Sequence, residues 1–322
     1  MNDTVDILIA TYNGETYLRE QLDSLIGQTY PHIRLIASDD GSTDGTLPIL
    51  EEYAKKYPHF TYTQNPENQG FIRNFAGLLS KVESPYFMFC DQDDVWGPQK
   101  IEKSLAKLKS EGADLVFTDL TVVDKELNVL YSSMVNIGQN RYFARKYTDY
   151  RMVYLRNIVT GCTILSRKEK IKDILPISDV FPMVHDWWVA LMAGQTGRIA
   201  FLDESTVQYR QHSGNQIGVY GFTGKSFGEY RAHYISLRIG QFRVYTQNND
   251  RFLLPLQVLN DQALQYFIHM ERVRRFSLRH ISLFCRIYQT EQFRQKCKQF
   301  LVLHFPAVGR LLFTLKHKVT VS

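Results

Sequence analysis

Residues 1–120 alternate between two kinds of hydrophobic pattern. Continuous apolar runs, which are typical of buried strands, lie at residues 5–10, 33–37, 60–63, 86–90 and 115–118. Between them, apolar side chains recur with helical spacing at residues 18–26, 47–54, 71–81 and 98–109. Such strand–helix alternation predicts an α/β fold, with a mostly parallel sheet and helices on both faces. Residues 131–156 have no periodicity that assigns them a structure.

Polar clusters follow three of the predicted strands. Thr11-Tyr12-Asn13 ends the first, Asp39 to Asp44 ends the second, and Asp91-Gln92-Asp93-Asp94 ends the fourth. In open α/β sheets, ligands bind at the carboxyl ends of the strands. The coincidence of three polar clusters with three strand ends therefore predicts a binding site along that edge.

The acidic cluster Asp91 to Asp94 is the sharpest of these signals. Three carboxylates crowded at a strand end repel one another, and a divalent cation relieves that repulsion. Mg²⁺ or Mn²⁺ held by one or two carboxylates and by substrate phosphates is a common arrangement. A short acidic turn that only caps the following helix is the alternative. The position of the acidic cluster directly after a buried strand favours the metal site.

Two basic side chains are candidates by context. Arg73 lies near the start of a predicted helix, where the charge and the helix dipole both favour a phosphate. His212 follows a strand-like segment in Tyr209-Arg210-Gln211-His212. An isolated histidine is more often structural, so His212 gains weight only from the other motifs.

The segment His185-Asp186-Trp187-Trp188 combines an ionisable pair with two aromatic residues. An apolar floor beneath a carboxylate raises its pKa toward neutrality, which suits a general base. The alternative is that Asp186 caps a helix over residues 186–193 and that Trp187 and Trp188 belong to the core. The sequence favours neither interpretation.

Charge divides the chain into two parts. Residues 1–219 hold 22 basic and 28 acidic residues, a net charge of −6, whereas residues 220–322 hold 16 and 5, a net charge of +11. We expect a catalytic domain over residues 1–219 and a basic helical region over 220–322. Its arginines alternate with apolar residues between 272 and 288, the profile of a helix on an anionic membrane surface. Packing on the catalytic domain or in a homodimer is the alternative. Nucleic acid is not expected, because no reader motif is present.

Cysteine usage and the first residues predict the compartment. Cys90, Cys162, Cys285 and Cys297 form no C-x-x-C pair, which is typical of reduced thiols in the cytoplasm. Residues 1–4 lack a basic segment of the kind that begins a signal peptide. We therefore expect a cytoplasmic protein, peripheral on the inner face of the cell membrane.

Taken together, these motifs resemble the inverting glycosyltransferases of family 2, over residues 4–219. The resemblance implies the Rossmann-like GT-A fold and a nucleotide-sugar donor. It assigns the base and ribose of the donor to Thr11, Tyr12, Asn13 and Asp39, and the diphosphate to Arg73. Asp93 becomes the direct metal ligand, and Asp91 a ribose or metal contact. Asp186 occupies the position of the catalytic base, with His185 in place of the more usual Glu, and His212 contacts the metal or the diphosphate.

A narrower resemblance concerns the donor. The segments at 90–96, 185–188 and 209–212 are similar to those of bacterial L-rhamnosyltransferases of cell-surface polysaccharide assembly. This similarity implies dTDP-β-L-rhamnose as donor and a lipid-linked glycan as acceptor. The methyl group of such a 6-deoxy sugar needs an apolar wall, for which Trp96, Trp187 and Trp188 are candidates, with His185 beside them.

Three alternatives remain open from the sequence. One is a transferase that uses a UDP-hexose. Another is a nucleotidyltransferase, which would have a glycine-rich loop with arginine directly after the first strand, unlike Thr11-Tyr12-Asn13-Gly14. The third is a non-catalytic protein that binds a sugar nucleotide or a polysaccharide, which would not turn over the donor in the presence of metal.

Overall fold

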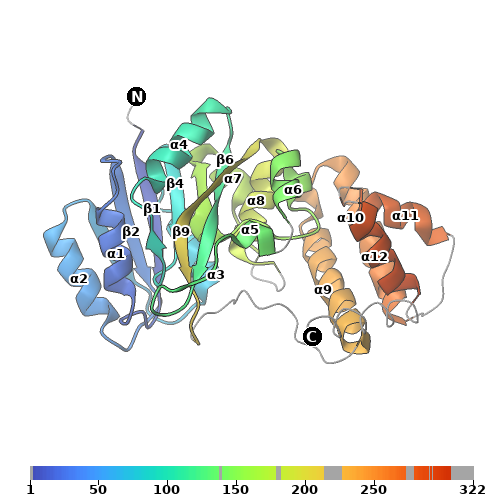
Figure 1. Cartoon of the computed structure of the whole chain (residues 1–322), viewed down its shortest axis with the longest axis horizontal. Helices are drawn as coiled ribbons and strands as arrows, with labels where there is room; N and C mark the ends of the chain where they lie inside the picture. Colours follow the sequence, from blue (N-terminus) through green and yellow to red (C-terminus); the bar gives the residue numbers. More distant parts are fainter. Residues whose placement is uncertain are drawn as a thin grey trace. The chain divides into compact units, whose positions relative to one another are not determined.

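The structure is a computed structural model that describes residues 3–137, 140–178, 183–213, 227–272, 279–289, 291 and 293–305. The chain forms two compact units (Figure 1). The first contains residues 1–179 and 184–217, and the second contains residues 180–183 and 218–322. Each unit has its own hydrophobic core, and each is described separately below.

The first unit is built on one mixed sheet with the strand order β3-β2-β1-β4-β8-β6-β9-β5, and β7 pairs with β6. The strands are β1 (Val5–Thr11), β2 (Ile33–Asp39), β3 (Phe60–Gln64), β4 (Tyr86–Cys90), β5 (Val95–Trp96), β6 (Leu115–Val123), β7 (Val129–Tyr131), β8 (Ile164–Arg167) and β9 (Ile199–Arg210). The four strands β3, β2, β1 and β4 are parallel. The predicted α/β fold is confirmed.

The other half of the sheet is mixed. β8 is antiparallel to both β4 and β6, β9 is parallel to β6, and β5 is antiparallel to β9. Because β5 and the end of β9 pair, the residues that follow β4 lie beside the residues that end β9. Val95 is opposite Gln208, two residues before Arg210.

Helices cover both faces of this sheet. The α-helices are α1 (Leu18–Ile26), α2 (Thr46–Lys56), α3 (Phe71–Leu79), α4 (Lys100–Ser110), α5 (Met134–Ile137), α6 (Arg141–Lys146), α7 (Ile171–Ile174) and α8 (His185–Thr196). Short 3-10 helices are η1 (Tyr150–Met152), η2 (Gly161–Thr163) and η3 (Lys168–Lys170). Phe89 and Cys90 are successive residues of β4 and so point to opposite faces. Phe89 contacts α3 and α8, whereas Cys90 contacts Gln21 of α1.

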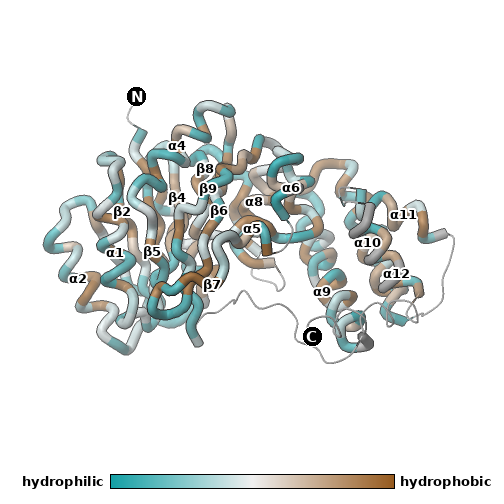
Figure 2. Tube along the Cα trace, in the orientation of Figure 1, coloured by the Kyte–Doolittle hydropathy of each residue, from teal (hydrophilic) through white to brown (hydrophobic). Residues whose placement is uncertain are grey.

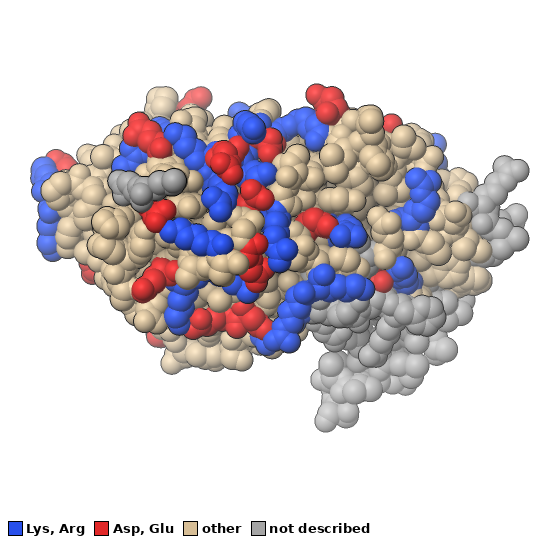
Figure 3. All heavy atoms as spheres, turned by 90° about the horizontal axis from the view of Figure 1, so that it is seen from above, with Lys and Arg blue, Asp and Glu red and all other residues tan. Residues whose placement is uncertain are grey.

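The core follows from the predicted hydrophobic pattern. The interior strands consist mainly of buried apolar residues, with a few buried polar ones such as Asp6 and Asp119. Figure 2 colours the trace by the hydropathy of each residue. Surface helices bury one face only, so that Leu18, Leu22 and Leu25 of α1 are buried together with Gln21. Acidic and basic side chains are interspersed on the surface drawn in Figure 3.

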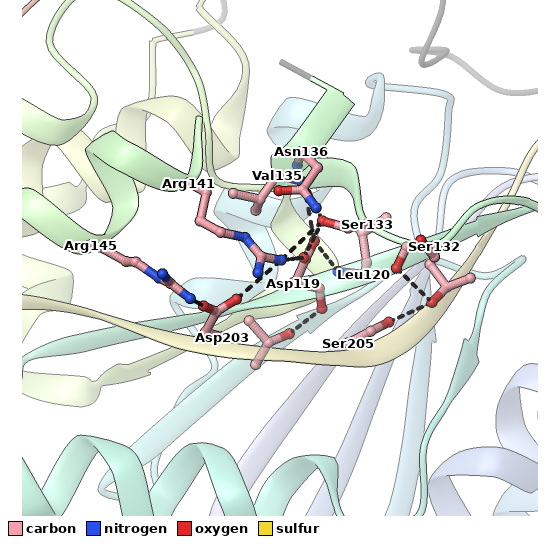
Figure 4. Close-up of polar contacts among 12 residues, drawn as sticks. Asp119, Leu120, Ser132, Ser133, Val135, Asn136, Arg141, Arg145, Asp203 and Ser205 are labelled. Carbon is pink, nitrogen blue, oxygen red and sulfur yellow. Dashed lines mark hydrogen bonds and ion pairs between the residues drawn. The ribbon is translucent and has the colours of Figure 1, made fainter. Parts of the chain in front are cut away.

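The segment of residues 131–156, which has no clear sequence pattern, is anchored by polar contacts (Figure 4). Asp119 lies at the register shift between β6 and β9 and accepts hydrogen bonds from Ser133 Oγ at 2.5 Å and from Val135 N at 3.2 Å. Arg141 reaches Asp119 and Asp203, which belongs to β9. Side-chain contacts rather than periodicity therefore place this segment.

The second unit is helical. Its described elements are α9 (Phe227–Gln247), η4 (Asn249–Arg251), α10 (Leu254–Arg272), α11 (Arg279–Ile287) and α12 (Phe293–His304). Phe242 of α9 stacks on Phe267 of α10, with ring centroids 5.7 Å apart. Within the described residues, no helix combines the length and the hydrophobicity that a membrane span requires.

The basic segment between residues 272 and 288 packs more than the sequence suggests. Phe284 and Ile287 are buried, and Phe284 contacts Phe300 and His304 of α12. This apolar face of α11 therefore belongs to the unit's own core, and contact with a membrane or with another subunit stays a prediction. Residues 273–278, with part of the basic segment, and the apolar run at 311–315 lie outside the described residues.

Candidate active site

The ends of β1 and β2 are joined by side-chain hydrogen bonds. The buried carboxylate of Asp39 accepts hydrogen bonds from Thr11 Oγ1 at 3.0 Å and from Ser42 N at 2.9 Å and Oγ at 2.5 Å. Ser42 Oγ in turn accepts a hydrogen bond from Asn13 N at 2.8 Å. Tyr12 is 43% exposed beside this cluster. The fold thus brings together the residues predicted to contact the base and ribose, and their role in binding stays a prediction.

Asp40 was not singled out in the sequence, but it fixes the next loop. Its buried carboxylate accepts hydrogen bonds from Asn65 Nδ2 at 2.9 Å, from Gln69 N at 3.0 Å and from Gly70 N at 2.8 Å. Gly70 has a φ of +83°, which glycine adopts without strain, and α3 begins directly after it. Asp40 therefore places the start of α3, where the exposed Arg73 lies. In the sequence, the position of Asp40 directly before Gly41 was the feature that could have pointed to this role.

The three carboxylates of the acidic cluster differ in their surroundings. Asp94 points inward and is fully buried. Its own burial and the nearby Asp93 and Asp91 carboxylates raise its pKa well above the usual range. Burial, together with the charges of Asp93 and Asp186, raises the pKa of Asp91 to about 7. Asp91 and Asp186, far apart in sequence, therefore lie within electrostatic reach of each other.

The end of β9 is fastened to this cluster. His212 Nε2 and Asp93 Oδ2 are 2.8 Å apart, and the contact of His212 with a metal or diphosphate stays a prediction. Arg210 is 2% exposed, and its guanidinium donates to the carbonyl oxygen of Asp93 at 2.8 Å and to Glu20. The same guanidinium lies over the ring of Tyr17, which also contacts the His212 ring.

Arg210, Tyr17 and Glu20 were missed as site residues in the sequence. Glu20 lies in α1, Tyr17 directly precedes that helix and Arg210 ends β9, so only the folded chain brings them together. The Arg210 guanidinium lies 4.6 Å from the centre of the Tyr17 ring, and a cation at this distance is attracted to the face of an aromatic ring. Arg210, Tyr17 and Glu20 lie behind Asp93 and His212, and we call these three residues the Arg210 brace.

The donor set suits a divalent cation. The oxygens of Asp91 and Asp94 lie within 4.8 Å of each other and of Cys162 Sγ. Mg²⁺ and Mn²⁺ prefer oxygen ligands, so a thiol is a poor candidate for either ion. Asp94 already accepts a hydrogen bond from Arg210 N at 3.1 Å. We therefore favour Asp91 and Asp93 as the residues that would hold the ion, and the raised pKa of Asp91 is the observation that fits it.

Asp186 lies in the first turn of α8, where the helix dipole favours a negative charge. Three donors hold its carboxylate. They are Asn157 Nδ2 at 2.9 Å, Gly161 N at 3.1 Å and Trp187 N at 2.5 Å. Burial outweighs these donors and raises the pKa of Asp186 to about 6. A carboxylate with this pKa is ionised at neutral pH and accepts a proton readily, as a general base must.

The aromatic residues predicted to line the sugar pocket need correction. Trp188 is 0% exposed, and its indole N–H donates to the carbonyl oxygen of Ile174. Trp96 is also buried, on the α4 side of the sheet, beneath the ammonium of Lys100. Both side chains belong to the core, because α8 and β5 are covered on these faces. Trp187 is buried too, but its main chain contacts Asp186, so its role in the pocket stays a prediction.

His185 is also buried more deeply than a pocket residue would be. Its ring stacks on Phe75 with centroids 4.3 Å apart, and it contacts Phe71 and Phe89 edge to face. Burial lowers the pKa of His185 to about 3, so the ring is neutral. Neither ring nitrogen has a hydrogen-bond partner among the described residues. The ring therefore supports the start of α8 from behind Asp186.

Comparison with known proteins gives a consistent result. Residues 6–175 match the model of glycosyl transferase family 2. A dTDP-rhamnosyl transferase of Shigella flexneri is 31% identical over 222 residues, which cover 65% of this chain and 73% of that protein. An uncharacterized glycosyltransferase of Haemophilus influenzae is 26% identical over 98% of this chain and 94% of its own length.

Solved structures extend the similarity in fold. S. aureus TarS in complex with UDP-GlcNAc is 20% identical, with a TM-score of 0.59 over 98% of this chain and 88% of that chain. A mannosyltransferase of Pyrobaculum calidifontis, in complex with GDP-Man and Mn²⁺, is 15% identical, with a TM-score of 0.56 over 99% and 80%. At these identities, the likeness concerns the fold alone.

Proposed function

The chain belongs to glycosyl transferase family 2, and from this premise we propose that it transfers L-rhamnose from dTDP-β-L-rhamnose, with inversion, to a hydroxyl group of a lipid-linked or polysaccharide acceptor. The observation that carries the proposal is the position of Asp186 near the end of β4, where the neighbouring His185 ring contacts Phe89 and Asp91 lies within electrostatic reach of Asp186. It sets the strand ends that suit a nucleotide beside a carboxylate that suits a general base. A non-catalytic binding protein would not need the second group.

The donor side of the proposal uses the strand ends. Tyr12 is exposed and offers a ring for the base, while Thr11 and Asp39 offer hydrogen-bonding groups for the base and ribose. Arg73 and the start of α3 suit the diphosphate, because a helix N-terminus and a cation both attract phosphate. When bound, a divalent cation would neutralise the charge that develops on the departing nucleoside diphosphate.

The acceptor side uses Asp186. Its carboxylate removes the proton from the acceptor hydroxyl as that oxygen attacks the anomeric carbon. A single displacement inverts the configuration, so a β-linked donor gives an α-linked L-rhamnoside. Asn157, Gly161 and Trp187 hold the carboxylate in place for this transfer.

The choice of L-rhamnose rests on the relative from Shigella flexneri, whose name specifies a dTDP-rhamnosyl transferase. UDP-hexose is the alternative donor class, and the TarS complex contains UDP-GlcNAc. An apolar contact to the 6-methyl group of rhamnose discriminates by only about 1–3 kcal/mol. We therefore expect preference for rhamnose with some transfer of other 6-deoxy sugars.

The test is a donor competition that measures release of the nucleoside diphosphate in the presence of Mn²⁺ or Mg²⁺. We expect dTDP-β-L-rhamnose to be consumed in preference to UDP-glucose, UDP-galactose and UDP-N-acetylglucosamine. Preference for a UDP-hexose would overturn the rhamnosyl assignment and leave the family assignment standing. Binding of donor without turnover, with a polysaccharide acceptor present, would favour the non-catalytic alternative.

We further propose that the second unit contacts an anionic membrane surface through exposed arginines, which would bring the enzyme to a lipid-linked acceptor on the inner face of the membrane. Arg243, Arg272 and Arg286 are exposed. Each basic residue near such a surface contributes about 1 kcal/mol. Replacing all three by glutamate should abolish cosedimentation with anionic vesicles and spare transfer to a short soluble acceptor. Unchanged cosedimentation would favour packing or a homodimer as the role of this unit.

A further inference from the structure

The two oxygens of the Asp186 carboxylate have different surroundings. Oδ1 accepts two hydrogen bonds, from Asn157 Nδ2 at 2.9 Å and from Trp187 N at 2.5 Å. Oδ2 accepts one, from Gly161 N at 3.1 Å. A carboxylate oxygen has two lone pairs in its plane, so Oδ1 is saturated and Oδ2 has one site left. Apart from the main-chain N–H of Asp186 itself, the described residues supply no further donor to this carboxylate.

The amide of Asn157 is fixed in the orientation that Oδ1 needs. Its own oxygen, Oδ1, accepts a hydrogen bond from Val159 N at 3.1 Å. An amide flip would turn the NH₂ group toward that N–H and the oxygen toward the Asp186 carboxylate, replacing two attractions by two repulsions. Asn157 therefore presents a donor, and only a donor, to Asp186.

The contact from Gly161 depends on a close approach. A Cβ atom at residue 161 would lie 2.7 Å from Nε2 of His185 and 3.6 Å from Cβ of Asp186. The His185 ring has no room to retreat, because it is packed against Phe75 and Phe89. The glycine lets its main-chain N–H reach Oδ2 from one side, and this leaves the other side of Oδ2 for a substrate.

We infer that Asn157 is a positioning residue for the base, and that Oδ2 of Asp186 is the atom that receives the proton of the acceptor hydroxyl. The inference rests on the proposed function. In this step the acceptor O–H bond breaks as the Oδ2–H bond forms. The acceptor oxygen bonds to the anomeric carbon, and the bond from that carbon to the diphosphate oxygen breaks, its electron pair leaving with the nucleoside diphosphate.

Loss of the Asn157 donor has a defined direction of effect. Burial disfavours the ionised form of Asp186, and the Asn157 amide is one of the donors that stabilise that form. The ionisable groups near Asp186 are Asp91, which lies within electrostatic reach, and the neutral His185. Neither compensates for the lost donor, so the pKa of Asp186 rises when Asn157 is replaced. The acidic limb of the kcat profile then moves to higher pH.

The experiment measures kcat against pH, and donor affinity, for the wild-type protein and for Asn157→Ala and Asn157→Ser. We expect the acidic limb, near pH 6 in the wild type, to move up by about one pH unit. At pH 6 this change in ionisation lowers kcat about fivefold, and at pH 8 the loss is less than about twofold. The donor Kd should stay within about twofold. Asn157→Asp should move the limb further, because it sets a second carboxylate against the first.

Asn128 provides the matched control. Its amide donates to Asp124 Oδ2 at 3.0 Å in the exposed turn before β7, the same type of contact in a different place. Asn128→Ala should leave the limb and kcat unchanged. An unmoved limb in folded Asn157 variants, or an equal loss of donor affinity, would overturn the inference. That outcome differs from failure of the proposed function, in which the wild-type protein transfers no sugar from any donor.

Discussion

Most of the described buried charges in the first unit are carboxylates, whereas the second unit buries the Arg231 guanidinium as well as Glu291, and secondary structure explains how the two kinds of group are held. The first unit buries carboxylates, each of which accepts main-chain N–H groups, at Asp6, Asp39, Asp40, Asp94, Asp119 and Asp186. The second unit buries Arg231, whose guanidinium donates to the carbonyl oxygens of Met270 and Leu303. These carbonyls belong to the last turns of α10 and α12. These N–H donors lie in loops, in the first turns of short helices and at the last residue of β9, whereas the last turns of α10 and α12 present free carbonyls.

Buried charges have different roles in the two units: some of those in the first unit belong to the candidate active site, whereas Arg231 in the second unit has a structural role. In the first unit, Asp91 and Asp186 lie within electrostatic reach of each other; burial raises the pKa of both, and the charges of Asp93 and Asp186 add to the shift of Asp91. Such a cluster is costly unless a cation or a proton transfer uses it. In the second unit, Arg231 is matched by neutral carbonyls and holds helices together. We therefore expect substitutions in the first cluster to change turnover and substitutions at Arg231 to change stability.

Removal of divalent cations should have the largest effect. With excess EDTA, we expect transfer to fall to the level of a protein-free control, because a bound metal supplies several kcal/mol of charge stabilisation. Mn²⁺ or Mg²⁺ should restore it. Asp93→Ala should weaken donor binding only when metal is present, and Asp261→Ala in the second unit serves as the control. Full activity in EDTA would mean that the acidic cluster is a polar turn or a metal-free site.

Asp186→Asn should rank next. Loss of a general base lowers the rate by about 10²–10⁴-fold, and the amide keeps the shape of the side chain. We expect kcat to fall in this range while the Kd for donor, measured by calorimetry, stays nearly constant. Asp261→Asn makes the same chemical change at an exposed position of α10 in the second unit. Near-wild-type turnover by the Asp186 variant would remove the proposed base.

The Arg210 brace predicts a smaller effect. Arg210→Lys keeps the charge but loses the planar guanidinium, which donates to the carbonyl oxygens of Asp93 and Lys125 and to the carboxylate of Glu20. Residues that orient metal ligands typically contribute about 10–100-fold in metal affinity or activity. We therefore expect the Mn²⁺ concentration for half-maximal activity to rise by about tenfold or more, with partial recovery of kcat at saturating metal.

Arg19→Lys is the control for this substitution. Arg19 lies in α1, as Glu20 does, and it forms an exposed ion pair with Glu52 of α2. It should leave the metal dependence unchanged. If Arg210→Lys lowers kcat equally at all metal concentrations, the brace does not act through Asp93 and His212.

Arg231→Met should have the smallest effect on turnover. It leaves two buried carbonyl groups without this donor, which costs about 1–3 kcal/mol of unfolding free energy. Urea denaturation should show the loss, while kcat at low temperature stays within about twofold of wild type. Arg243→Met, on the exposed side of the same helix α9, should change neither quantity. A large loss of turnover in the folded Arg231 variant would show that the second unit takes part in transfer.

The sequence by itself determined the order of the elements and the places where chemistry gathers. Each apolar run before residue 120 became a strand, because a buried strand and an amphipathic helix are local patterns. The polar clusters at Thr11, Asp39 and Asp91 lie at strand ends for the same reason. The family resemblance is confirmed by the match over residues 6–175.

Only the tertiary structure decided which way individual side chains point and what they contact. Trp96 and Trp188 face the core, although in the sequence they stand close to the acidic cluster and to Asp186. Asn157 reaches Asp186, and Arg210 reaches Glu20, across long stretches of chain. Periodicity assigns a residue to a face of its own helix or strand. It does not identify the partner that a different element brings to that face, since packing and hydrogen bonding between distant segments choose it.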